Sequence, residues 1–168
     1  MLTSHELLGF MSPALASDVL QFTFESDKPA YKATIAAVAQ ARHVRPVFLE
    51  RQPRDTRHVA MLAALSKPQL DGAAGALLRA WLVKKHKAML VDFLNALDIP
   101  NEEGVVEDLP AGVDDNKLKA AVEILLGKYQ PEVVGVYLNA FNDMNTANWP
   151  NLKTMLESDA RLQLGNHP

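Results

Sequence analysis

Three side chains that can bind an anion stand close together behind a proline. Arg54, Arg57 and His58 follow Pro53, a spacing that places them on adjacent turns at the start of a helix, where the first backbone amides have no partner. Guanidinium groups and free amides are the donors that bind phosphates and carboxylates. The pattern predicts an anion site for a phosphate, a nucleotide or an acidic segment of a partner.

Two further arginines, Arg42 and Arg45, extend this patch. From residue 42 to residue 57 the chain carries five arginines and two acidic residues, a local net charge of +3. In the alternative interpretation, these arginines pair with Glu50, Asp55 or the acidic segment described next, and have no function beyond solvating the surface.

A segment of opposite charge follows in the middle of the chain. From Asp98 to Asp115 there are seven acidic residues and no basic one, a local net charge of −7. The prolines and glycines within it predict a loop over 99–115, and connections this long are either functional or mobile. Its carboxyl groups are expected to be solvated, so none has the raised pKa of a general acid. Val105 and Val106 could form a short strand, but no segment is evident that would pair with it.

A second basic cluster, Lys84, Lys85 and Lys87, surrounds His86. No aromatic residues alternate with either basic cluster to stack on bases, and no helix-turn-helix pattern is present. Lysines at the C-terminal end of a helix also interact favourably with its dipole. Nucleic-acid binding is therefore the weakest of the functional hypotheses.

Motifs for catalysis and for metal binding are missing from the sequence. There is no cysteine, which excludes disulfides, thiolate nucleophiles and zinc fingers, and there is no Gly-x-Ser-x-Gly or glycine-rich phosphate loop. His5 and Glu6 are followed by Gly9 where a zinc protease has its second histidine. Asp55 and His58 are only two ligands. We expect no catalytic residue, no metal and no cofactor.

Most of the ten prolines stand just ahead of an apolar pattern with helical spacing, where proline is tolerated. On one of these helices, 53–65, the predicted apolar stripe is Val59, Leu62, Ala63 and Leu65. The longest apolar pattern spans 68–98. On an unbroken helix its apolar stripe would have to include Lys85 or His86, so we predict a break in the helix there. The expected helices lie within 1–16 and near 13–24, 29–39, 46–49, 53–65, 68–82, 89–97, 115–129, 131–144 and 150–156.

These elements predict an all-α fold, an irregular bundle of antiparallel helical hairpins with about seven to nine helices. We expect a single helical domain over 1–168, with the acidic loop 99–115 crossing one end and a loose tail over 162–168. Aromatic residues on the apolar faces are assigned to the core: Trp81, Phe93, Tyr129, Tyr137 and Phe141.

No apolar run reaches the length needed to cross a bilayer. Glu6 lies within the first apolar stretch and no basic residue precedes it, so we expect a soluble, cytoplasmic protein. The leading hypothesis is a non-catalytic interaction or structural module, acting through the 42–58 surface or the acidic loop on a protein partner or a second copy. The alternative is a ligand-binding or enzymatic domain that recognises an anionic small molecule through Arg54, Arg57 and His58. Nucleic-acid binding ranks third.

Overall fold

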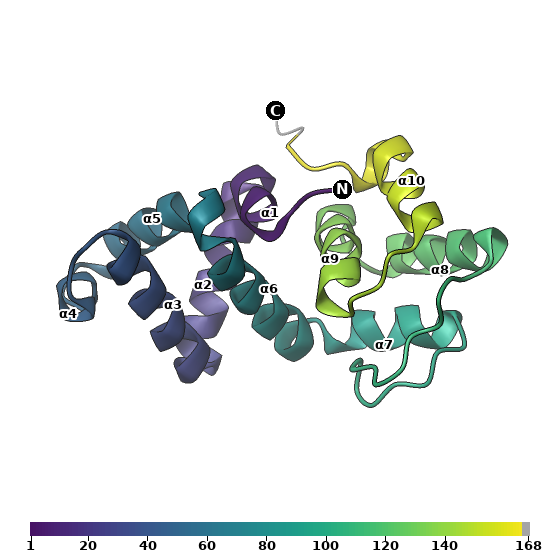
Figure 1. Ribbon diagram of the computed structural model, residues 1–168, viewed down its shortest axis with the longest axis horizontal. Coiled ribbons are helices and arrows are strands. Elements are labelled where there is room, and N and C mark those ends of the chain that lie inside the picture. The colour runs from purple at the N-terminus through teal and green to yellow at the C-terminus, as the bar shows by residue number, and fades with distance from the viewer. Residues whose placement is uncertain (166–168) are drawn as a thin grey trace. The chain divides into compact units, whose positions relative to one another are not determined.

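The computed structural model describes residues 1–165, and this part of the chain is all-α, which confirms the predicted fold class. Figure 1 shows the helices in chain order. Their bounds are α1 Ser4–Phe10, α2 Pro13–Ser26, α3 Lys28–Ala41, α4 Pro46–Glu50, α5 Arg54–Leu65, α6 Asp71–Lys85, α7 Lys87–Ala96, α8 Asp115–Lys128, α9 Pro131–Met144 and α10 Pro150–Ser158, with short 3-10 helices η1 Pro68–Leu70 and η2 Ala160–Leu162.

Proline begins many of these helices, as the sequence predicts, and capping side chains precede several of them. Pro13, Pro46, Pro131 and Pro150 each occupy the first residue of a helix. Asp114 caps α8, and its carboxylate accepts hydrogen bonds from two first-turn amides. Such caps satisfy donors that the helix itself leaves unpaired.

Contacts between Cα positions divide the chain into two compact units. The N-terminal unit is Leu2–Trp81, and the C-terminal unit comprises Met1 and the described residues from Leu82 onward. The division falls within α6. The single domain expected over 1–168 stays a prediction.

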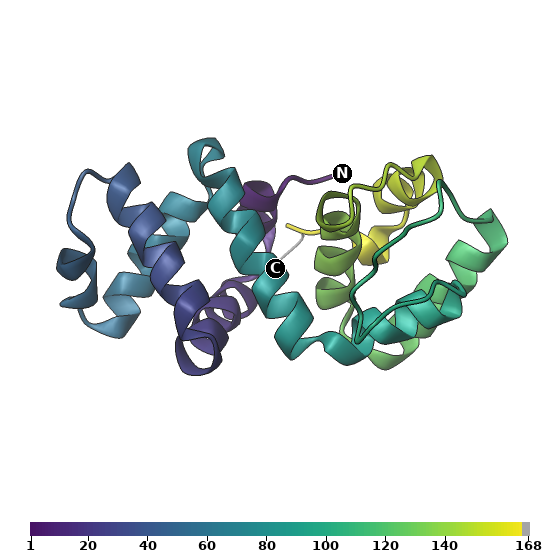
Figure 2. The same ribbon diagram turned by 60° about the horizontal axis from the view of Figure 1, so that its bottom comes forward.

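In the N-terminal unit, α3 contacts α2, α4 and α5, and α1 packs against α5 and η1. Figures 1 and 2 both show α4 at one end of this unit. The core is mainly aliphatic, and its fully buried side chains include Leu7, Val19, Leu20, Val38, Leu49, Met61 and Leu65 together with Trp81.

The C-terminal unit is built around α9. Ten consecutive residues of this helix, from Val133 to Asn142, are buried, and α8, α10 and η2 contact it. The aromatic rings of Phe93, Tyr137, Phe141 and Trp149 form a chain of contacts with centroids 5.0–5.9 Å apart. This cluster contains four of the six aromatic side chains that are buried among the described residues. Edge-to-face contacts between the rings stabilise it.

One glycine sets how closely η2 approaches α9. A Cβ atom at Gly135 would lie 2.7 Å from the carbonyl oxygen of Leu162, so only glycine allows this contact without a shift. Leu162 itself is buried. The loose tail was predicted to start at residue 162, but Leu162 is the last residue of the 3-10 helix η2, so the predicted start is too early. The last residues of the predicted tail, 166–168, lie outside the described residues.

The acidic connection between α7 and α8 folds back on α7. Val105 and Glu102 form an isolated antiparallel bridge, with N···O distances of 2.8 and 3.0 Å, so the suggested strand is reduced to one turn. Gly104, with φ of 86°, lies against Leu90 of α7. Figure 2 shows the connection leaving α7, doubling back and reaching the start of α8.

The predicted break in the longest pattern is confirmed at His86, which separates α6 from α7 with φ of −109° and ψ of 27°. The described residues contain ten α-helices, one more than the seven to nine expected. The number is higher because the break at His86 divides one apolar pattern into two helices and because the five-residue α4 is a helix of its own. No single described helix is both long and apolar enough to span a bilayer; α1 and α2, bent by 120°, meet that test only when joined.

Candidate functional site

The segment that carries the arginines is confined between two helix ends. His43, with φ of 56°, lies in the left-handed region just after Arg42 ends α3. Pro46 is the first residue of α4, and Pro53 precedes the first residue of α5. Arg42 caps the end of α3, Arg45 and Arg51 flank the five-residue α4, and Arg54 and Arg57 lie in the first turn of α5.

Arg57 and His58 are buried in the N-terminal unit, with 8% and 6% of their surface exposed. Arg57 donates a hydrogen bond to the carbonyl oxygen of Glu50 at 3.1 Å, and its guanidinium lies 5.6 Å from the ring centroids of Phe24 and Tyr31. The hydroxyl of Tyr31 lies 2.7 Å from Nε2 of His58. Both side chains are thus used in packing α5 against α2 and α3.

This burial keeps His58 neutral. Desolvation, together with the positive charges of Arg57 and Arg54, lowers the pKa of His58 to about 4, while Asp55 acts in the opposite direction. Burial also raises the pKa of Tyr31. A neutral imidazole has one donor and one acceptor nitrogen, and the Tyr31 hydroxyl can pair with Nε2 in either tautomer because a hydroxyl both donates and accepts. At neutral pH, His58 carries no charge that would attract an anion.

Arg54 differs from its two predicted companions in its exposure to solvent. It is exposed, and its guanidinium lies 5.4 Å from the centroid of Phe24. The Nε atom of Arg57 is buried and has no hydrogen-bond partner among residues 1–165. An anion held jointly by Arg54, Arg57 and His58 stays a prediction, and only the first of the three faces solvent.

The buried face of α5 differs from the predicted stripe. Arg57, His58, Met61 and Leu65 are buried, whereas Val59 is 70% exposed. Of the predicted stripe only Leu65 is buried, and the other three positions were wrong because the prediction followed hydrophobicity alone. An imidazole or guanidinium group that packs against aromatic rings can occupy a core position.

The exposed residues beside α4 combine guanidinium groups with apolar side chains. Phe48 is 53% exposed and Val47 is 44% exposed. A depression of about 580 Å³ is lined by Val44, Arg45, Val47, Phe48, Arg51 and Gln52. We define the Arg–Phe surface as Arg42, Arg45, Val47, Phe48, Arg51 and Arg54, all of which are exposed.

The four arginines of this surface have no carboxylate within ion-pair distance among the described residues. Glu50 and Asp55 are also exposed, so the exposed groups sum to a net charge of +2. The geometry therefore does not support the alternative in which these arginines pair with nearby acids. The sequence predicts the helix α4 but not which of its faces is exposed. Val47, Phe48 and Leu49 are consecutive apolar residues on one turn, and the pattern does not identify which of them is buried.

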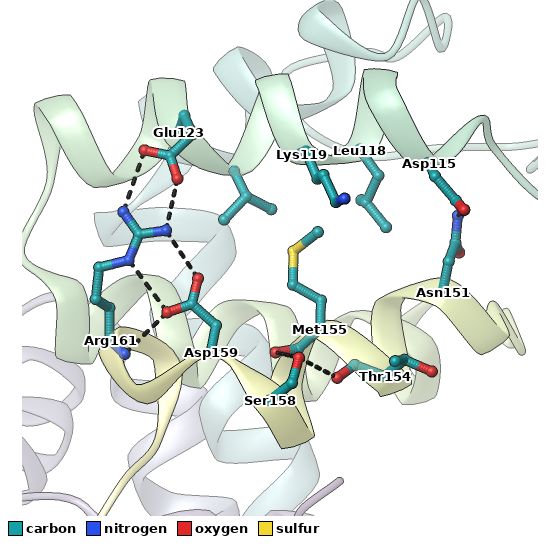
Figure 3. A pocket seen from close by; sticks show the side chains of 11 residues that line it. Asp115, Leu118, Lys119, Glu123, Asn151, Thr154, Met155, Ser158, Asp159 and Arg161 are labelled. Atoms are coloured by element: carbon teal, nitrogen blue, oxygen red, sulfur yellow. Dashed lines mark hydrogen bonds and ion pairs between the residues drawn. The ribbon is translucent and has the colours of Figure 1, made fainter.

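A groove lies between α8 and α10 in the C-terminal unit, with a volume of about 650 Å³. Its apolar floor is formed by Leu118, Val122 and Met155, and Figure 3 shows Met155 reaching from α10 toward α8. Lys119 also lines it, and its ammonium has no hydrogen-bond or ion-pair partner among residues 1–165.

One end of this groove is closed by ion pairs. Arg161 makes two hydrogen bonds to Glu123, at 2.5 and 3.1 Å, and also binds the carboxylate of Asp159, as the dashed lines in Figure 3 show. These contacts lower the pKa of both carboxyl groups. At the other end, Asn151 donates to Asp115 at 2.9 Å. The sequence analysis did not identify this groove, because its residues come from two segments with no motif.

The carboxylates of the acidic connection fall into two groups. Asp98 pairs with Lys117 at 2.6 Å and Glu103 with Lys87 at 3.2 Å. The remainder of the connection between α7 and the cap of α8 carries Glu102, Glu107 and Asp108, which are exposed and have no ion-pair partner among the described residues. With Pro100, Asn101 and Val105, these three line a depression of about 430 Å³.

One arrangement in the N-terminal unit resembles part of a proton relay. Nδ1 of His5 lies 2.7 Å from a carboxylate oxygen of Asp71 and 3.2 Å from the hydroxyl of Thr3. In a proton relay the carboxylate and the nucleophile contact different nitrogens of the imidazole ring. Here the Asp71 carboxylate and the Thr3 hydroxyl both contact Nδ1 of His5. The trio therefore fixes the start of α1 to the start of α6 and does not activate Thr3.

Within residues 1–165, no three histidine or acidic side chains are grouped so as to hold a metal ion. The chain matches no protein-family model, no curated protein and no solved structure.

Proposed function

We propose that this protein is a non-catalytic interaction module that binds, through the Arg–Phe surface, a protein segment carrying both acidic and apolar side chains. The single observation that supports this is Phe48, a half-exposed aromatic ring that lies with Arg45 and Arg51 around one depression. Aromatic residues and arginine are enriched where proteins bind each other, and lysine is not.

The energetics favour a partner of mixed chemistry. Covering the exposed half of Phe48 and of Val47 contributes on the order of 1–2 kcal/mol. Carboxylates placed against Arg45 and Arg51 add directional, bidentate hydrogen bonds and fix the register of the partner. A purely apolar partner would leave these guanidinium groups desolvated without an acceptor, which costs free energy.

Nucleic acid is a less suitable partner for the same surface. A phosphate backbone attracts a continuous basic face, whereas Glu50 and Asp55 reduce the exposed charge here to +2. The chain as a whole carries a net charge of −3. The cytoplasmic location expected from the sequence likewise stays a prediction.

A titration monitored by NMR tests the proposal. The probe is a short synthetic peptide in which Glu alternates with Phe and Leu, and the control peptide has Lys in place of Glu. We expect chemical-shift changes confined to residues from the end of α3 to the start of α5, for the acidic peptide alone. The changes should disappear in Phe48→Ser combined with Arg45→Glu.

Three outcomes would count against this function. They are no shift at any peptide concentration, equal shifts with the lysine peptide, or shifts that persist in the double variant. Binding of a short DNA duplex to the same residues, weakened steeply by salt, would favour the nucleic-acid hypothesis instead.

A second candidate is the binding of an anionic small molecule with an apolar body in the groove between α8 and α10. The observation that favours it is the unpaired ammonium of Lys119 beside the apolar side chain of Met155. The groove volume lies within the usual range for small-molecule sites.

A thermal-shift screen with aliphatic and aromatic carboxylates tests this candidate, because a ligand of the native state must raise the melting temperature. Lys119→Met should abolish the shift, whereas Lys153→Met, on the exposed part of α10, should leave it unchanged. A screen without any shift would remove this candidate.

A further inference from the structure

We infer that the partner of the Arg–Phe surface is a second copy of this chain, docked through its acidic connection at Glu102, Val105, Glu107 and Asp108. This inference rests on the proposed function and adds the identity of the partner. It depends on the charge, the exposed apolar side chains and the backbone geometry of the two surfaces.

The charges of the two surfaces are complementary. Four exposed arginines on one surface have no carboxylate partner, and three exposed carboxylates on the other have no cationic partner, among residues 1–165. Each remaining acid of the connection is already used: Asp98 and Glu103 form ion pairs, Asp114 caps α8, and Asp115 accepts from Asn151. The carboxylates that remain unpaired are therefore only part of the acidic segment, and all three of them line one depression.

Both surfaces also expose apolar side chains at their centres. Val105 is 40% exposed and lines the depression formed with Glu102, Glu107 and Asp108. Phe48 is 53% exposed and lines the depression formed with Arg45 and Arg51. An interface with an apolar centre and a charged rim has the composition of most protein contacts. Here the rim charges would have opposite signs on the two sides.

The acidic surface is preorganised. Two backbone hydrogen bonds join Glu102 to Val105, and the side chain of Asn101 accepts a third from the amide of Gly104 at 3.1 Å. Gly104 has φ of 86°, which a residue with a Cβ atom rarely adopts. A turn that is already fixed loses little conformational entropy on binding.

The two surfaces are made of different residues, so the contact is heterologous. A heterologous contact gives rings or open chains, whereas a contact between two identical patches gives a closed dimer. Each molecule would use one surface of each kind, and association would continue beyond two copies unless a ring closes.

Sedimentation velocity of the full chain, over a wide range of protein concentrations, tests the inference. We expect the weight-average sedimentation coefficient to rise with concentration at low salt and to fall back at about 0.5 M NaCl, where charges are screened within a few ångströms. Two charge-reversed variants remove one surface each: Arg45→Glu with Arg51→Glu, and Glu107→Lys with Asp108→Lys. Each should weaken association about tenfold or more.

Mixing the two variants gives the sharpest result. Each variant alone is expected to be monomeric, yet each retains one intact surface. An equimolar mixture should associate again, because the acidic connection of the first variant and the Arg–Phe surface of the second are both intact, and the two reversed surfaces also carry opposite charges. Lys32→Glu with Lys67→Glu is the matched control, since it makes the same change in charge at exposed positions of the N-terminal unit outside the Arg–Phe surface. It should associate like the unmodified chain.

The outcomes separate the two proposals. If the acidic peptide binds the Arg–Phe surface but the chain stays monomeric at all concentrations, the second copy is not the partner and the proposed function stands. If neither occurs, both proposals fail. Association that survives reversal of Glu107 and Asp108 uses another face and overturns the inference. Circular dichroism of every variant confirms that loss of association is not loss of folding.

Discussion

His58 shows at the scale of one residue how the N-terminal unit depends on protonation. Its imidazole is buried against Tyr31 and close to two guanidinium groups, and its pKa is lowered to about 4. In the unfolded chain the same group takes up a proton near its ordinary pKa of 6.5. Between these two values the unfolded state binds more protons than the folded state, so acid favours unfolding.

We therefore expect the contribution of His58 to stability to be complete above pH 6.5, to fall between pH 6.5 and pH 4, and to be lost below pH 4. The total loss is up to about 3 kcal/mol. Urea unfolding at a series of pH values measures it. His58→Gln should have a flatter profile over this range, which isolates His58 from the carboxyl groups. Equal slopes, or an NMR titration of His58 near pH 6.5, would contradict the prediction.

Thr146 is a residue whose backbone conformation does not suit its side chain. Its φ is 52°, a left-handed conformation that is unfavourable for a β-branched residue and easier for asparagine. Thr146 is exposed, and its hydroxyl bonds only to the neighbouring carbonyl of Asn145.

Thr146→Asn should therefore stabilise the protein by about 1 kcal/mol, measured as a higher melting temperature. The control is Thr154→Asn, an exposed helical position in α10, where asparagine has no conformational advantage and should stabilise nothing. A melting temperature that rises equally in both variants would argue that the backbone conformation at residue 146 is not the cause.

Sequence reasoning at the scale of residues located the arginines but not their orientation. The spacing of Arg54, Arg57 and His58 correctly indicates neighbouring helical turns, yet it does not tell which turn faces the core. The orientation is decided by Phe24 and Tyr31, more than twenty residues earlier in the chain, whose rings accept the guanidinium and imidazole groups. A long-range packing contact of this kind leaves no local pattern.

At the scale of elements, α9 and η2 depend on one glycine. Gly135→Ala would place a methyl group 2.7 Å from the carbonyl oxygen of Leu162, and a backbone oxygen cannot turn aside as a side chain can. We expect a destabilisation of about 2–3 kcal/mol, measured by chemical unfolding.

The matched control is Gly127→Ala in α8. A Cβ at this position would meet no atom within 4 Å apart from its chain neighbours and the backbone of its own helix, and the position is helical and exposed. Alanine is the better helix former, so this variant should gain up to about 1 kcal/mol. If both substitutions changed stability in the same direction, the close approach at Gly135 would not be the reason.

The elements themselves were largely predictable. Proline at a first helical residue is a local signal, and the break at Lys85 or His86 followed from an apolar stripe that could not continue through charged residues. The exposed face of α4 and the groove between α8 and α10 were not predictable. Each depends on which neighbours cover a helix, and five residues of α4 are too few to show a periodicity.

At the scale of the whole molecule, the two compact units each bury their own apolar residues. A fragment of residues 1–85, which ends with α6, contains the entire N-terminal unit. A chain of this length can bury enough surface to fold alone, with modest stability. We expect the fragment to be helical and to unfold cooperatively on heating, as followed by circular dichroism.

Tryptophan fluorescence provides a second measurement on this fragment. Trp81 is fully buried and donates to Asp18 at 3.1 Å, and it is the only tryptophan of the fragment because Trp149 lies outside. A blue-shifted emission that changes in step with the helical signal is the expected result. A gradual, non-cooperative transition would instead support the single domain predicted from the sequence.

Charge distribution was the feature of the whole molecule that sequence reasoning described best. The excess of arginine in 42–57 and of acid in 98–115 is visible without any structure. The structure adds which of these groups remain unpaired, and that distinction depends on contacts such as Lys117 with Asp98, nineteen residues apart.

The close seating of η2 against Gly135 also has a kinetic consequence. Since ten consecutive residues of α9 are buried, solvent deuterium reaches its amides only when a neighbouring element moves away. The 3-10 helix η2, with three residues, is the smallest element that contacts α9 and so the least costly to release. Hydrogen exchange along α9 would then be gated by a local opening of the chain near Leu162, well before the unit unfolds.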